Sequence, residues 1–172
     1  MDKNKVTESN AHRNKKEMLS YIEKINLSSK IKEVIREMLE VILLSGKNDI
    51  NLDFEDLKVI MSHGGELFGG TGEYEGENSA NEAIKLAIKD STLDFNLLDK
   101  VTGILIHLQI HPGFPIMEIG EAMELINDNA HYDADIIWGT SASDLVGEKY
   151  VKVTVLFAKF KENVVANIAK CN

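Results

Sequence analysis

Cysteine and proline are scarce in this chain of 172 residues, and long apolar runs are missing. The single cysteine, Cys171, excludes a disulfide framework and a CxxC metal or redox site within one chain. No run approaches the roughly 20 apolar residues that a membrane span requires, and the first residues are polar where a signal peptide requires an apolar segment. The composition, 44% hydrophobic and 27% charged, therefore indicates one soluble globular domain, which we expect in the cytoplasm.

Positive charge is also scarce outside the N-terminal segment. The net charge is -9, yet residues 1–32 hold 8 basic and 4 acidic side chains, which leaves 11 basic against 24 acidic in the rest. A body this acidic repels phosphate backbones, so we expect no nucleic-acid partner for the folded part. We expect residues 1–16 to form a disordered basic arm, with contact to an anionic partner as the alternative.

Helical periodicity marks the first third of the chain. Apolar residues at positions 18, 21, 22 and 25 predict a short amphipathic helix. A long helix with a wide apolar stripe follows from a serine cap at Ser28 or Ser29 and ends at Gly46. We therefore expect residues 17–45 to form N-terminal helices. After the turn GKNDIN, the segment LDFEDLKVIMS has acidic residues in its first turn and predicts another helix.

Strand patterns alternate with helices further along the chain. Strands are predicted at residues 66–74, 101–110, 134–139 and 149–160, where 101–110 and 149–160 show alternating faces. Ser79 and Glu82 form a predicted capping box, and Pro115 suits the first turn of a further helix. This order predicts an α/β fold, an α+β sandwich with a four-stranded sheet covered by helices, over residues 46–162. Residues 163–172 are expected to be a short tail.

The segment from Asn51 to Asp56 reads N-L-D-F-E-D. It resembles the N-x-D-F-x-D synergy loop of FtsZ, the bacterial tubulin homologue. The resemblance continues in order through FGGTGEYEGENSANEAIKLAI, KVTGILIHLQI and ADIIWGTSASDLVGEKYVKVTVLFAKF, and spans about residues 28 to 160. It implies the C-terminal domain of the FtsZ/tubulin family, preceded by the family's long core helix.

The family's nucleotide-binding domain would stand before the long helix, where this sequence has only 27 residues. We therefore expect no cofactor on this chain alone, with GTP and Mg held by a partner. The segment GGTGEYEG at residues 69–76 superficially echoes the family's phosphate loop, but Glu73 and Glu75 would repel phosphate. We interpret it as a strand. His107 and His111 lie too far apart on a strand to share a metal, so no metal site is predicted.

The resemblance implies catalytic roles in trans for the loop. In the family, the synergy loop enters the nucleotide pocket of the next subunit, so Asp53 and Asp56 would orient the attacking water and Asn51 would donate or accept hydrogen bonds there. The residues alone favour a simpler interpretation, in which Asp53 is an N-cap, Asp56 matches the helix dipole and Asn51 forms a turn. The two roles are compatible.

Three functions remain open at this point. The first is a module that docks its synergy loop on FtsZ or another tubulin-like GTPase, regulates or caps polymerisation, and stimulates GTP hydrolysis in trans. The second is the C-terminal half of a split or truncated FtsZ-like GTPase. The third is a structural, self-associating protein that kept the fold and lost the chemistry. Replacing Asp53 and Asp56 separates the first from the third.

Overall fold

The computed structural model describes residues 3–44 and 49–159, with side chains from His12 onward. Its elements follow the order α1 (Lys3–Lys24), α2 (Ser29–Leu44), α3 (Phe54–Ser62), β1 (Glu66–Glu75), α4 (Ser79–Asp90), the 3-10 helix η1 (Phe95–Lys100), β2 (Val101–Ile110), α5 (Ile116–Asn129), β3 (Asp135–Ala142) and β4 (Tyr150–Lys159).

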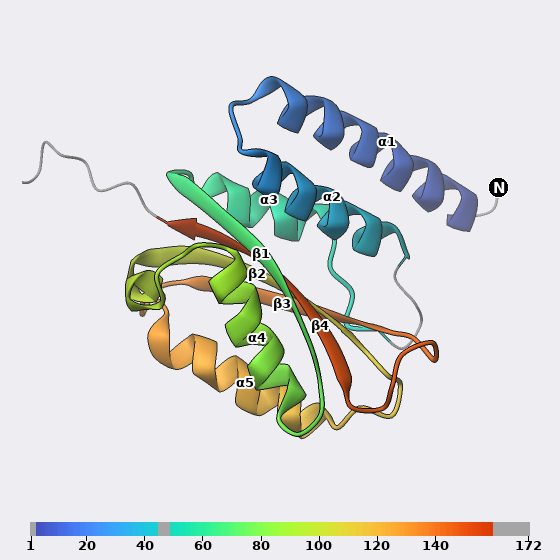
Figure 1. Ribbon diagram of the computed structural model, residues 1–172. Helices are drawn as coiled ribbons and strands as arrows, with labels where there is room; N and C mark the ends of the chain where they lie inside the picture. Colours follow the sequence, from blue (N-terminus) through green and yellow to red (C-terminus); the bar gives the residue numbers. More distant parts are fainter. Residues whose placement is uncertain (1–2, 45–48, 160–172) are drawn as a thin grey trace, which may run out of the picture.

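The sheet has four strands in the order β1-β4-β2-β3. β4 is antiparallel to both β1 and β2, whereas β3 runs parallel to β2. The parallel pair is joined by α5, because parallel strands require a crossover connection. In Figure 1, α4 and α5 cover one face of the sheet, and α2 and α3 cover the other. The predicted α/β fold with a four-stranded sheet is therefore confirmed.

The two faces of the sheet belong to two apolar cores. On β2, Ile104, Ile106 and Leu108 face the core under α4 and α5, whereas Leu105 faces the core under α2 and α3. β4 shows the same alternation, with Phe157 in the first core and Leu156 in the second. Since helices cover both faces of the sheet, the side chains on both faces of β2 and β4 are mostly apolar. This explains why apolar residues run almost without interruption along these two strands.

The glycine-rich segment of β1 serves helix packing. A Cβ atom on Gly70 would lie 2.4 Å from the Ala87 carbonyl oxygen, and one on Gly72 would lie 2.3 Å from the Ala83 carbonyl oxygen. Both oxygens belong to α4, so the absence of side chains lets this helix approach the strand closely. The interpretation of GGTGEYEG as a strand is confirmed.

The start of α4 differs from the sequence prediction. Its N-cap is Asn78, in the left-handed conformation with φ 54°, and no side chain caps the helix. The Ser79 hydroxyl is buried and has no hydrogen-bond partner among the described residues. The predicted capping box of Ser79 and Glu82 is therefore wrong, because the helix begins one residue earlier than that pattern requires.

α1 is longer than the sequence predicted. The helix spans Lys3–Lys24, whereas residues 1–16 were expected to be a disordered arm. In the part that was expected to be disordered, the Lys15 ammonium lies 2.5 Å from Glu40 of α2, and this ion pair attaches the helix to α2 ahead of the predicted apolar stripe. Within the stripe, Ile22 is fully buried and Glu23 pairs with Arg36.

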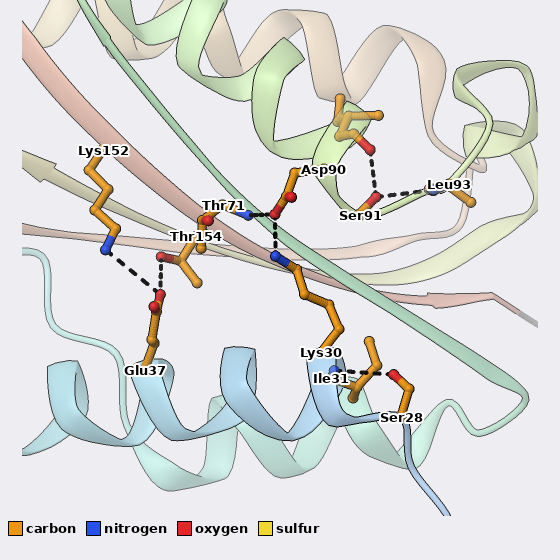
Figure 2. A network of polar contacts seen from close by, with 11 residues as sticks. Ser28, Lys30, Ile31, Glu37, Thr71, Asp90, Ser91, Leu93, Lys152 and Thr154 are labelled. Atoms are coloured by element: carbon orange, nitrogen blue, oxygen red, sulfur yellow. Dashed lines mark hydrogen bonds and ion pairs between the residues drawn. The ribbon is translucent and has the colours of Figure 1, made fainter.

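α2 is fixed to the sheet by polar contacts as well as by its apolar stripe. Figure 2 shows Glu37 of α2 accepting a hydrogen bond from the Thr154 hydroxyl of β4 at 3.3 Å. Nearer its N-terminus, the Lys30 ammonium lies 2.5 Å from Asp90 at the end of α4, and Asp90 also accepts from the Thr71 amide. The Ser28 hydroxyl accepts from Ile31 N–H, which confirms the predicted serine cap.

Candidate functional site

The motif segment 51–56 precedes and opens α3. Its side chains alternate between the protein interior and solvent: Leu52 and Phe54 are buried at 3% and 8% exposure, whereas Asn51 and Asp53 are exposed. Leu52 and Phe54 belong to the core under α2, which holds the segment against the body. Of the polar residues named from the sequence, Asn51 and Asp53 therefore lie at the surface, whereas Asp56 is half-buried.

Residues 49–50 fix the loop to the edge strand β3. The Ile50 carbonyl accepts a hydrogen bond from Thr140 N–H at 2.9 Å, and Ile50 N–H donates to the Thr140 hydroxyl at 3.1 Å. The carboxylate of the preceding residue, Asp49, accepts a hydrogen bond from Ala142 N–H at 2.9 Å. These bonds satisfy edge groups of β3 and extend the sheet by a short piece of loop.

Gly139 makes this close approach possible. A Cβ atom at that position would lie 2.5 Å from the Ile50 carbonyl oxygen and 2.7 Å from the Leu52 side chain. The loop position thus depends on a glycine about 90 residues away in the sequence, in the strand against which the loop lies. The position of the loop motif therefore depends on the absence of a side chain at Gly139.

Asp53 and Asp56 form a capping box. The Asp53 Oδ1 atom accepts from Glu55 N–H at 2.8 Å and Asp56 N–H at 3.0 Å, and the Asp56 Oδ2 atom accepts from Asp53 N–H at 2.8 Å. The predicted N-cap role of Asp53 is confirmed. Within the described residues, each carboxylate uses one oxygen for the cap, which leaves the Asp53 Oδ2 and Asp56 Oδ1 atoms for an external group.

The opposite end of α3 is tied to the sheet through a histidine. The His63 Nε2 atom lies 2.8 Å from the Asp135 carboxylate of β3, and its Nδ1 atom lies 3.2 Å from the Thr102 hydroxyl of β2. The segment before α3 and the end of α3 are therefore both attached to β3. The roles of His63, Thr140 and Gly139 were not predictable from the sequence, because only the fold brings β3 against the loop and α3.

A cleft of about 240 Å³ lies beside the loop, between α2 and the sheet. His107 from β2 lines it, is 4% exposed, and has no partner for its Nε2 atom among the described residues. Burial lowers the pKa of His107 to about 4, against a smaller opposing effect of the negative charge of Asp49. The ring is therefore neutral at neutral pH. Polar groups of Glu37, Lys152 and Thr154 line the same cleft.

Metal-binding clusters and membrane-spanning helices are both absent from the described residues. No group of three or more histidine, cysteine, aspartate or glutamate residues lies close enough together there to hold a metal ion. Within the same residues, no helix combines the length and the apolar character needed to cross a bilayer. The candidate site therefore consists of the acidic loop with the strand that holds it.

A long helix followed by an acidic capped loop, a short helix and a mixed four-stranded sheet defines a C-terminal domain of the tubulin superfamily. Residues 65–161 match the family described as "FtsZ family, C-terminal domain". The chain belongs to the FtsZ family.

Individual relatives agree with this assignment. The chain is 32% identical over 121 residues to the cell division protein FtsZ of Helicobacter pylori. The matched region covers 70% of this chain and 31% of that protein. Against the FtsZ of Neisseria gonorrhoeae the identity is 32% over 114 residues, covering 66% of this chain and 29% of that one. The chain thus spans less than a third of the length of these relatives.

Solved structures give the same fold. An empty FtsZ dimer of M. jannaschii matches with a TM-score of 0.60 and 27% identity, over 81% of this chain and 42% of that chain. TubZ of Bacillus thuringiensis serovar israelensis, in GDP-form protofilaments, matches with a TM-score of 0.59 over 81% of this chain and 38% of that one. Its identity is only 11%, so this likeness concerns the fold alone.

Proposed function

We propose that this chain docks its synergy loop, residues 51–56, on the nucleotide face of FtsZ or another tubulin-like GTPase in the cytoplasm and thereby regulates polymerisation. The observation that carries the proposal is the capped loop itself. Asp53 and Asp56 are fixed by their mutual hydrogen bonds, yet each keeps one carboxylate oxygen for an external group. A preorganised loop of this kind requires little further ordering on binding.

The chemistry of such a loop is positional. Hydrolysis of a nucleoside triphosphate depends mainly on placing a water in line with the γ-phosphate, while metal and backbone donors neutralise the phosphate charge. Asp53 and Asp56 would orient that water, and Asn51 would hydrogen bond at the interface. Two carboxylates repel a triphosphate unless a cation or water lies between them, so GTP and Mg²⁺ belong to the partner in this proposal.

Polymer capping follows from the same arrangement. A docked copy of this domain that is not joined to a nucleotide-binding domain would end a filament at one end only. Stimulation of GTP hydrolysis in trans would accompany capping if both carboxylates reach the water.

Co-sedimentation with a tubulin-like GTPase, loaded with GTP or GDP, tests the docking. We expect binding that depends on GTP and is lost in the variant Asp53→Asn, Asp56→Asn, because asparagine retains a cap but not the charge. Glu55→Gln is the matched control, since Glu55 is exposed in the same turn and pairs with Lys58 at 2.6 Å outside the capping box. Equal binding by all three proteins would reject the proposal.

The second candidate is the C-terminal half of a split FtsZ-like GTPase. The observation that favours it is length, because the chain spans 31% of the Helicobacter pylori protein. A tight 1:1 complex with a separate nucleotide-binding domain, formed through α2, would support it.

The capping box favours a third, purely structural role for Asp53 and Asp56, which predicts that the double asparagine variant changes neither binding nor polymer mass.

A further inference from the structure

An apolar groove of about 610 Å³ lies at the other end of α3 from the synergy loop. It is bordered by the end of α1, the turn into α2, the end of α3 and the beginning of β1, and its apolar lining includes Met18, Tyr21, Ile25, Leu27, Met61 and Leu67. Tyr21 is 54% exposed, so the groove leaves an aromatic side chain in contact with solvent. A further apolar segment lying in the groove would remove these side chains from water.

The C-terminal end of β4 leads directly to this groove. Lys159, the last residue of β4, is the antiparallel partner of Glu66, and its ammonium lies 3.7 Å from the Glu66 carboxylate. Glu66 itself lines the groove together with Gly64, Gly65 and Leu67. The chain therefore passes from the sheet to the rim of the groove without an intervening linker. Residues 160–172 lie outside the described residues.

The sequence of this segment matches an apolar groove. Phe160, Val164 and Ile168 recur every four residues, a spacing that would bring the three side chains to one face if the segment were helical. A helix over the segment would extend about 20 Å at 1.5 Å per residue. We propose that residues 160–172 dock in this groove through the face formed by Phe160, Val164 and Ile168, and so clamp α1 and the end of α3 onto β1.

The tail is favoured over other occupants because it is already attached at the rim. A covalently linked segment binds at a high effective concentration and avoids the loss of translational freedom that a second copy or a separate ligand incurs. Bound there, the tail would cover Met61 of α3 and Met18 of α1, and these methyl groups report on the groove from two sides.

Cys171 supplies a specific probe, since it is the only cysteine in the chain. A nitroxide attached to Cys171 of the full chain broadens nearby methyl signals, which are read from ¹³C-methyl-labelled methionine by comparing the oxidised and reduced label. Met117 is the internal reference. It is 73% exposed and lies beyond the far end of the ten-residue strand β2, about 30 Å from the groove.

We expect the Met18 and Met61 signals to lose most of their intensity, while Met117 retains its own. The variant Val164→Asp, Ile168→Asp should restore both signals, whereas Ala166→Asp, Ala169→Asp, which adds the same charge on the opposite face of such a helix, should not. Unchanged shifts of the buried Met38 methyl would show that the fold is intact.

Equal attenuation of all exposed methionines would overturn the proposal, as would a pattern that the Val164 and Ile168 substitutions leave unchanged. Attenuation that disappears on dilution would assign the groove to the tail of a second copy and would also contradict it.

Discussion

Asp53 and Asp56 hold each other at the start of α3: Asp53 N–H donates to the Asp56 carboxylate at 2.8 Å, and Asp56 N–H donates to the Asp53 carboxylate at 3.0 Å. The two carboxylates that resemblance assigns to an external active centre are therefore also the cap of their own helix. Structural and functional roles share the same residues, and substitutions must be chosen to separate them.

Asp53→Ala is expected to lower the free energy of unfolding by about 1 kcal/mol, because it removes the acceptor of two backbone N–H groups. Asp53→Asn should cost much less, since asparagine caps nearly as well as aspartate. Urea denaturation monitored by circular dichroism measures both values. Equal loss in the two variants would show that charge, not capping, stabilises this helix start.

Gly139→Ala should displace the loop and destabilise the protein by about 1–3 kcal/mol, because the new methyl group would lie 2.5 Å from the Ile50 carbonyl oxygen. Gly120→Ala is the control, since Gly120 lies in α5 with nothing within 4 Å of a built Cβ atom, and alanine there should stabilise by roughly 0.5–1 kcal/mol. Thermal unfolding compares the two. A neutral Gly139→Ala would mean that the loop is not held at this strand.

Stability should fall in mild acid through His107. Burial lowers its pKa from 6.5 to about 4, so between these values the unfolded chain binds a proton that the folded chain excludes. The free energy of unfolding then decreases as the pH falls from about 6.5 to about 4, by at most about 3 kcal/mol. In His107→Gln this part of the pH dependence should vanish. Parallel pH profiles for the two proteins would contradict the burial of a neutral ring.

A second acid-sensitive contact is the pair of Lys30 and Asp90. The Lys30 ammonium, together with Thr71 N–H, holds the pKa of Asp90 below its usual value. The pair therefore contributes fully to the free energy of unfolding at a pH above the usual pKa of aspartate, and this contribution is lost as the pH falls through the lowered pKa of Asp90. Lys30→Met should cost about 0.2–1 kcal/mol at neutral pH, because the pair is partly exposed. Lys85→Met, which breaks a local pair with Glu82, should cost less. The reverse order would contradict a tie between α2 and α4.

The strands were predictable because their patterns are local. In β2 and β4 the side chains alternate along the sequence, and the structure places Ile106 and Leu105 in opposite cores as that alternation requires. The loop motif was also readable, since Asp53 stands directly before an apolar helical pattern. Its cap follows from the chemistry of a short carboxylate at a helix start.

The rest depended on contacts distant in sequence. Gly139, Thr140 and His63 have no pattern of their own and gain their roles only when β3 comes to lie against the loop and α3. Local pattern was also insufficient at the start of α4. Ser79 and Glu82 have the spacing of a capping box, but the helix begins one residue before the position that this pattern requires.

The most direct test of the account is the GTP turnover and polymer mass of a partner FtsZ with increasing amounts of this chain. We predict that the wild-type chain changes both quantities and that the variant Asp53→Asn, Asp56→Asn, which keeps the cap, changes neither. A saturating wild-type chain that leaves turnover and polymer mass unaltered would contradict the claim that the loop acts on another subunit.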